Sequence, residues 1–430
     1  MTTQRRNFLR LCGYAGIGTL TGCLDYSETD ETAVNQIKLT ATDGDQEEAF
    51  GMSVSVSSDG TTTIIGATGT DGSDSDKAGS AYVFEKSRGS WTKQAKLTPK
   101  NDDKNERFGN SVALSEDGTT AIVADYRDNG PHGPWSGSVY LFENTDDSWT
   151  QQIKLTPDDG ETDDQFGSSV AISNDGTTAI IGAVGDATPN AQLMGSAYVF
   201  ETIEGSWIQR AKLTADDGDT GDSFGMSVSV SDDGSTAIIG ASADDNTNGP
   251  QAGSAYVFDG SSESWGQQAK LIPDDGARMD FFGKSVALSS DGTTAIIGAV
   301  GDWDQNGDKT YVFEATEESW VQQATLTDDG DRTDRFGVSA AVSNDGTTAI
   351  VGAFYDDNQN GEDAGAVYVF KKSGESWTRE VKHISDDGDP EDSFGYAVAM
   401  SSDGTTAVVG APDDVDPNGE YAGSAYVLAL

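Results

Sequence analysis

The 430-residue sequence has few basic residues, cysteines and histidines, and these shortages exclude several classes of protein. Lys and Arg total 26 against 73 Asp and Glu, a formal charge of −47. Nucleic acid is therefore not an expected partner, because phosphate binding needs a cationic face. Two cysteines and two histidines cannot supply a disulfide scaffold or a zinc site rich in His and Cys. The kind of metal site that this composition does not exclude is one with oxygen ligands.

Hydrophobic residues are also scarce, at 35%, while glycines number 52. This composition disfavours a helical bundle and favours an all-β chain rich in turns. Acidic chains of low hydrophobicity are often disordered, but here Val, Ile, Tyr, Phe and Trp recur at fixed places. We expect a folded, halophilic protein whose surface carboxylates keep it soluble in concentrated salt.

The N-terminus is typical of an export signal. Arg5 and Arg6 precede about ten weakly apolar residues, too few for the ~20 that span a bilayer. The paired arginines resemble a twin-arginine signal, and Leu-Thr-Gly before Cys23 resembles a lipoprotein cleavage box. We expect residues 1–22 to be a signal peptide, Cys23 to carry a lipid, and residues 23–33 to form a polar tether. The alternative, in which Cys23 is an ordinary residue of a leader cut elsewhere, stays open.

A single unit is repeated seven times in the rest of the chain. The pair Phe-Gly recurs every 58 residues, with one interval of 54, at Phe50, Phe108, Phe166, Phe224, Phe282, Phe336 and Phe394. Asp-Gly follows nine residues after each Phe, between short β-branched runs, which is a hairpin signal. A complete unit predicts four strands, as at 224–231, 236–241, 253–258 and 265–271.

The offset of the repeats predicts a closed ring. The seventh unit ends at Leu430 after its third strand, and residues 34–40 match the fourth strand of the other units. Pairing the segment around Ile37 with that around Tyr426 would close the ring and remove exposed strand edges. We therefore predict an all-β, seven-bladed β-propeller over residues 34–430, with four antiparallel strands in each blade.

Phe-Gly at the start of the first strand and Gly-Ala after the second, complete as Gly410-Ala411-Pro412 in the last unit, resemble the FG-GAP repeat. The family includes the N-terminal propeller of integrin α subunits. The resemblance implies an extracellular binding, adhesion or scaffolding role, often with calcium. In the integrin-type repeat calcium binds between the first and second strands, where this chain has only a tight Ser-x-Asp-Gly turn. We expect Asp59 and its equivalents to form turns instead.

Oxygen-rich loops between the predicted second and third strands are the candidate calcium sites. Side-chain oxygens three, five and seven residues after the Ala, ahead of a Gly, are the first half of a calcium loop, but the bidentate Glu at the twelfth position is missing. A second acidic loop, which links one blade to the next, is expected on the same face. The alternative is hydrated loops held by Asx turns. The candidate ligands are Asp244, Asn246 and Asn248; Asp302, Asp304, Asn306 and Asp308; Asp356, Asn358 and Asn360; and Asp414, Asp416 and Asn418.

The second unit has a different loop, with Tyr126, Arg127, His132 and Trp135 as candidate partner contacts. Exposed Tyr, Arg and Trp residues are common anchors in interfaces. The alternative is that Trp135 only covers a neighbouring loop. We predict a monomeric module at the cell surface, attached to the membrane by its lipid only, which binds an extracellular protein or glycan without an organic cofactor.

Two alternatives to a binding module stay open. One is a structural part of a surface assembly. The other is a glycosidase or lyase, which needs carboxylates or a metal supplied by residues that break the repeat. The predicted first strands repeat Ser, Ala and Val, and only Lys284 and Tyr396 break the pattern. No histidine pairs with a nucleophile, so we expect no enzymatic activity.

Overall fold

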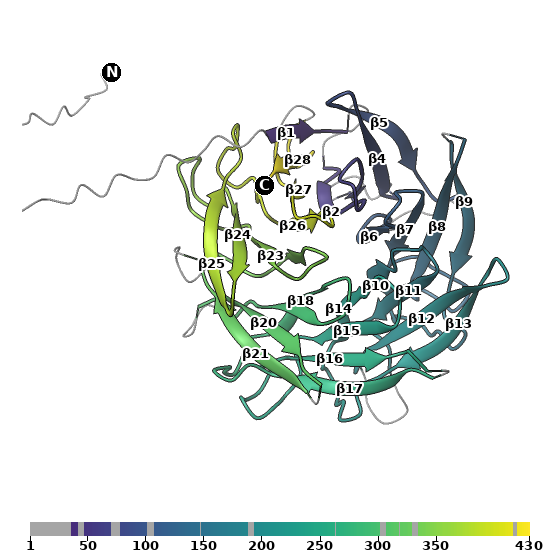
Figure 1. Cartoon of the computed structure of the whole chain (residues 1–430). Helices are drawn as coiled ribbons and strands as arrows, with labels where there is room; N and C mark the ends of the chain where they lie inside the picture. Colours follow the sequence, from purple (N-terminus) through teal and green to yellow (C-terminus); the bar gives the residue numbers. More distant parts are fainter. Residues whose placement is uncertain are drawn as a thin grey trace, which may run out of the picture. The chain divides into compact units, whose positions relative to one another are not determined.

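Seven four-stranded antiparallel sheets surround a common axis in the computed structural model, which confirms the predicted seven-bladed propeller (Figure 1). The structure describes residues 36–41, 47–69, 78–100, 107–146, 148–187, 193–262, 264–301, 307–317, 319–328, 334–415 and 419–430. The chain divides between Ala33 and Val34, and Val34–Leu430 forms one unit. The predicted export signal, with Arg5, Arg6 and Cys23, lies outside the described residues.

In six sheets the strands run in sequence order from the axis outward, and in the seventh β26, β27 and β28 are followed by β1 at the outer edge. The first strands are β2 (Phe50–Val56), β6 (Val112–Leu114), β10 (Phe166–Ile172), β14 (Phe224–Val230), β18 (Phe282–Leu288), β22 (Ala340–Val342) and β26 (Ala397–Met400). The second strands are β3 (Thr62–Ala67), β7 (Thr120–Asp125), β11 (Thr178–Ala183), β15 (Thr236–Ala241), β19 (Thr294–Ala299), β23 (Thr348–Ala353) and β27 (Thr406–Ala411).

The third strands are β4 (Ser80–Ser87), β8 (Ser138–Thr145), β12 (Ser196–Ile203), β16 (Ser254–Asp259), β20 (Lys309–Ala315), β24 (Ala366–Ser373) and β28 (Ser424–Ala429). The outer strands are β5 (Ser90–Leu97), β9 (Ser148–Leu155), β13 (Ser206–Leu213), β17 (Gly266–Leu271), β21 (Trp320–Leu326), β25 (Ser376–His383) and β1 (Gln36–Leu39). We number the blades one to seven from the blade that contains β2.

The N-terminal strand closes the ring as predicted. β1 pairs with β28, with Ile37 opposite Val427 and Lys38 opposite Tyr426. First strands of neighbouring blades contact one another all the way around, including β2 and β26. The last blade therefore has its fourth strand, and the first and last blades are held together by backbone hydrogen bonds.

The core lies between blades. The Phe of each Phe-Gly pair is buried and contacts the Tyr ring of the third strand, as Phe50 meets Tyr82 edge-on with ring centroids 5.4 Å apart. The second strand contributes Ile, Val and Ala that are fully buried, such as Ile64 and Ile65. Burial of each such side chain stabilises the fold by about 1.5–3 kcal/mol, so the repeated apolar positions account for the stacking of blades.

The Ser-x-Asp-Gly turns lie at one end of the axis, which we call the turn end. The Asp59 carboxylate accepts hydrogen bonds from the Ser57 hydroxyl at 2.8 Å and from the Thr61 backbone N–H at 2.9 Å. These hydrogen bonds outweigh the effect of burial and lower the pKa of Asp59. The other six turns use the same bonds, so these aspartates form turns, as predicted.

A ring of backbone hydrogen bonds joins the seven turns around the axis. The N–H of one residue in each turn donates to the carbonyl of its equivalent in the next blade, at 2.9 to 3.3 Å, and the seventh turn donates back to the first. The residues are Ser58, Glu116, Asn174, Asp232, Ser290, Asn344 and Ser402. The opposite end, which carries the loops between second and third strands and the links between blades, is called the loop end below.

Candidate functional site

The first residue of each proposed calcium loop lies in a buried ion pair. Asp244 is 2% exposed, and its carboxylate is 3.0 Å from the Lys270 ammonium and 3.2 Å from the Tyr256 hydroxyl. Lys270 also pairs with Asp217 of the link between blades, at 2.7 Å. Burial alone would lower the pKa of Lys270, but its two carboxylate partners raise it. A lysine from the outer strand therefore already balances the charge of this loop.

The same Lys, Asp and Tyr arrangement recurs around the ring. Lys382 lies 2.7 Å from Asp356, and Lys38 lies 2.8 Å from Asp414. Blade two, which lacks the predicted calcium pattern, has it as well, since both Lys154 and the Tyr140 hydroxyl contact Asp128. The Lys, Asp and Tyr contacts thus occur in blades with and without the predicted calcium pattern. They are therefore part of the blade architecture.

In blades three, four and seven the two acidic loops meet at the loop end, as predicted. Burial has the largest effect on the Asp222 carboxyl and raises its pKa. The Asp219 backbone N–H opposes this effect, the Asp244 carboxylate adds to it, and the resulting pKa is about 6. Lys270 also acts on this group and favours its ionised form. In this blade the cation between the two acidic loops is a lysine.

The asparagines of the proposed loops hold the loop backbone. The Asn246 side chain donates to the Gly253 carbonyl at 2.6 Å and accepts from the Asn248 N–H at 2.8 Å. Asn248 in turn donates to the Pro273 carbonyl at 2.8 Å, which ties the loop to the next link between blades. Asn358 and Asn360 make the equivalent bonds in blade six. These are the Asx turns of the alternative interpretation.

The predicted calcium loop of blade five lies mostly outside the described residues, as do Asp416 and Asn418. Asp302, Asp304 and Asn306 are not described, whereas Asp308 is buried and accepts the Gly301 N–H at 3.0 Å. Burial raises the pKa of Asp308 to about 7. Within the described ranges its Oδ2 has no hydrogen-bond partner, and no group of three His, Cys, Asp or Glu residues is placed to bind a metal ion.

The predicted contact residues of blade two are brought together at the loop end. The Arg127 guanidinium lies 5.5 Å from the centroid of the Tyr126 ring and 5.4 Å from that of Trp135. Trp135 is 46% exposed. The His132 ring lies against Gly160 of the following link. The structure thus assembles three of the four predicted residues into one surface, which we call the Trp135 surface.

A buried carboxylate that the sequence analysis missed supports this surface. Asp125 ends β7, where the other second strands end in Ala, and it is fully buried. Its Oδ1 accepts the N–H groups of Arg107 at 2.9 Å and Arg127 at 3.1 Å, while its Oδ2 has no partner in the described part of the chain. Burial raises the pKa of Asp125 to about 7. The break in the Gly-Ala motif was the signal for this residue.

Aromatic side chains gather around the axis at the loop end. Phe354 lies 4.2 Å from Tyr355 and 5.2 Å from Tyr396 between ring centroids. Tyr396 also interacts electrostatically with Arg107 and Tyr126 of blade two. Large residues of blades two, six and seven thus face one another. At this end of the axis the side chains therefore differ from one blade to the next.

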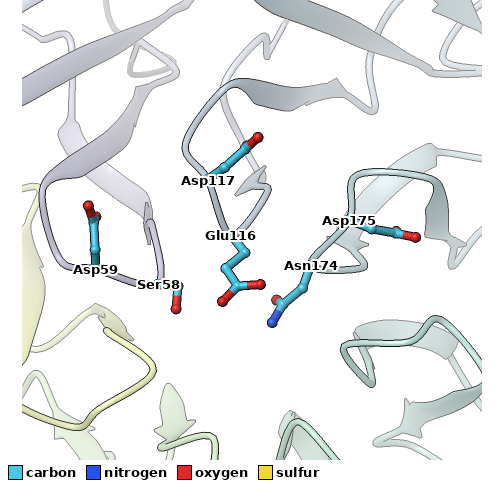
Figure 2. A pocket seen from close by; sticks show the side chains of 6 residues that line it. All are labelled: Ser58, Asp59, Glu116, Asp117, Asn174 and Asp175. Atoms are coloured by element: carbon cyan, nitrogen blue, oxygen red, sulfur yellow. The ribbon is translucent and has the colours of Figure 1, made fainter.

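The turn end has a different character. A pocket there is lined by Ser58, Asp59, Glu116, Asp117, Asn174 and Asp175. Figure 2 shows Ser58, Glu116 and Asn174 directed toward the axis, with the turn-forming aspartates directed away from it. Lysine and arginine are absent from this lining. Because the pocket is built from turns that every blade repeats, its acidic lining is part of the architecture.

The FG-GAP repeat pattern matches residues 34–84, 91–142, 149–200, 207–258, 265–313, 320–370 and 377–428. The chain belongs to the FG-GAP repeat family. A search of curated proteins gave no match. In the described residues, no helix is both long and apolar enough to span a membrane.

Two solved structures show the same fold. The β-propeller domain of Cps50 (Swd1) from Myceliophteria thermophila is 10% identical, with a TM-score of 0.58 over 92% of this chain and 99% of that one. The periplasmic gluconolactonase PpgL of Pseudomonas aeruginosa is 16% identical, with a TM-score of 0.50 over 78% of this chain and 86% of that one. At these identities the likeness concerns the fold alone.

Proposed function

We propose that this FG-GAP propeller is an extracellular binding module that contacts a protein or a glycan through its loop end. The observation that carries the proposal is the Trp135 surface, in which Arg127 lies over two aromatic rings and Trp135 is 46% exposed. Tyr, Trp and Arg supply most of the binding energy in protein interfaces. Loops on a rigid scaffold are the usual place for such residues.

The backbone of the loop that carries Trp135 is fixed by the blade architecture. Trp135 has a φ of 53°, a left-handed conformation that the equivalent residues of blades three, four, six and seven share. Its N–H donates to the Asn129 side chain at 3.3 Å, and the loop starts from the buried Asp125. What distinguishes blade two is the set of side chains that this shared backbone presents at the surface.

The proposed location rests on the N-terminal sequence. Arg5 and Arg6 would direct export, and a lipid on Cys23 would hold the protein at the outer face of the cytoplasmic membrane. The polar residues that follow Cys23 would then separate the propeller from the lipid surface.

A divalent cation is a separate part of the proposal, and we assign it to the loop of blade five. One Asp308 oxygen there has no hydrogen-bond partner among the described residues, although the Arg335 charge is near, while Asp244, Asp356 and Asp414 each lie in a direct ion pair with a lysine. Carboxylate and amide oxygens are the ligands that calcium prefers. Asp302, Asp304 and Asn306 would complete the set.

The proposed function is tested with the exported protein and the extracellular material of the cells that produce it. Wild type should bind this material, and Trp135→Ala should weaken binding by about tenfold or more. Tyr421→Ala is the matched control, because Tyr421 is 49% exposed on another blade. Equal binding by all three proteins would favour a structural role and would reject the Trp135 surface as the binding site.

A further inference from the structure

The seven first strands differ at one position near the loop end of the axis. The residue two after the Phe of each Phe-Gly pair is Met52, Asn110, Ser168, Met226, Lys284, Val338 or Tyr396. Phe282 pairs with Ala299, the last residue before the loop of its blade, so Lys284 lies close to the loop end. One blade therefore places a lysine on the inner edge of the ring.

Lys284 differs from the structural lysines of this protein in its partners. Lys38, Lys212 and Lys270 each lie between two carboxylates, at 2.7 to 3.0 Å. The Lys284 ammonium makes no hydrogen bond or ion pair to any described residue, and the charge that acts on it is that of Arg335. Burial has the larger effect and the Arg335 charge the smaller one, and both lower the pKa of Lys284. Within the described ranges, no carboxylate is paired with this cation.

Arg335 and the aromatic group lie next to this lysine. The Arg335 guanidinium donates to the Gly301 carbonyl at 3.3 Å and faces the Asp308 carboxylate. The Tyr355 N–H donates to the Asp334 carbonyl at 3.1 Å, which places the backbone of Arg335 beside Phe354 and Tyr355. Because Phe354 also contacts Tyr396, cations and aromatic rings form one arc over blades five, six and seven.

Lys284 is half-buried, and no described residue supplies it with a counter-ion. Partial burial of an unpaired cation is unfavourable, and an anionic ligand would relieve it. An arginine adds a second charge, and aromatic rings beside the cations offer flat apolar surfaces against which a sugar ring packs. We propose that the loop end of the axis binds a carboxylate-bearing sugar, with Lys284 and Arg335 on the carboxylate and Phe354 and Tyr396 against the ring. The inference rests on the proposed binding function and names the ligand class.

The test uses the exported full-length protein in concentrated KCl with sodium glucuronate as the probe, and glucose and sodium sulfate as comparison solutes. Calorimetry gives the affinity, and mass spectrometry gives the rate at which an acylating reagent modifies Lys284, since a lysine amine with a lowered pKa is nucleophilic. Glucuronate should bind and should slow the modification. Glucose should do neither, and sulfate should protect less than glucuronate.

Lys284→Met is the decisive variant, because Met226 occupies the same position in blade four. This variant should melt like wild type and should bind glucuronate about tenfold more weakly or worse. Adding Met226→Lys restores the net charge and should not restore binding. Unchanged affinity in Lys284→Met, or no protection by glucuronate, overturns the proposal, and equal protection by sulfate overturns the sugar assignment. Binding of extracellular material through Trp135 is measured in a separate experiment. The proposed function and the sugar site at Lys284 can therefore be rejected independently.

Discussion

Gly66 and Gly109 lie against each other across the interface of the first two blades, so close that a Cβ on Gly66 would be 2.0 Å from the Gly109 carbonyl oxygen. Gly66 belongs to the Gly-Ala pair of one blade and Gly109 to the Phe-Gly pair of the next. Gly410 and Gly51 repeat the contact where the ring closes. The two halves of the repeat motif are thus a single contact between neighbouring blades.

This contact predicts a strong requirement for glycine. Gly109 has a φ of +91°, and a Cβ there would lie 2.4 Å from the Ser80 carbonyl oxygen. We expect Gly109→Ala to lower the free energy of unfolding by roughly 1–3 kcal/mol or more, measured by denaturant unfolding. Gly266→Ala is the control, because nothing lies within 4 Å of a Cβ at that position. Equal effects of the two changes would refute the explanation.

Ring closure predicts that Lys38 has a large effect on stability. Lys38→Met would leave Asp414, a buried carboxylate, without its cation. We expect a loss of about 3 kcal/mol, the lower end for a broken buried ion pair, since Lys38 is partly exposed. Lys371→Met, on the exposed part of β24, should change the thermal midpoint little. A midpoint that is the same in both variants would contradict the proposed role of this pair.

The buried Asp125 predicts a pH dependence of stability. Its pKa is about 7 in the folded protein and about 3.9 in an unfolded chain. Between these values the native state binds the extra proton, so the free energy of unfolding falls as the pH rises from about 4 to about 7. Asp125→Asn keeps an acceptor for both backbone N–H groups and removes this part of the slope. We expect it to stabilise the protein at pH 7 by roughly 2–4 kcal/mol.

Asp117→Asn is the control for that experiment and should have the opposite sign. Hydrogen bonds from Thr119 and Ser115 outweigh burial and lower the pKa of Asp117. A depressed pKa contributes stability above the unfolded value that is lost as the pH falls through the folded one. Asp117→Asn should therefore destabilise the protein at neutral pH. A pH profile unaltered by Asp125→Asn would show that Asp125 does not titrate as described.

The calcium proposal predicts a melting midpoint that depends on chelator at fixed high salt. Binding to the native state alone raises stability with ligand concentration, so a chelator should lower the midpoint of wild type. A variant with Asp302→Ala and Asp304→Ala should melt at the chelated midpoint in both conditions. Asp244→Asn should respond to chelator as wild type does, because Lys270 balances that loop. A wild-type midpoint that ignores chelator would reject the cation.

The repeat made the fold predictable, since seven aligned units and an offset strand leave few topologies. The expected contact around Ile37 and Tyr426 was found one residue away, with Lys38 opposite Tyr426. The ion pair of Asp244, in contrast, could not be predicted from the repeat. Its partner Lys270 lies 26 residues on, and only the strand register that sets Tyr256 opposite Lys270 brings them together.

The candidate site was predictable only where residues are close in sequence. Tyr126, Arg127 and Trp135 share one loop, so their grouping followed from sequence. Lys284 and Tyr396 were visible as irregular residues of the first strands, but they belong to different blades. Their shared end of the axis depends on the closed ring, which local patterns do not describe.

The most direct test of the central claim is to map which end of the propeller meets the partner. A photo-crosslinking amino acid is placed at Trp135 on the loop end and, in a second protein, at Asp117 on the turn end, and each exported protein is irradiated on its own cells. The account predicts covalent adducts to extracellular material from the position of Trp135 and none from that of Asp117. Adducts from Asp117 with none from Trp135 would contradict it.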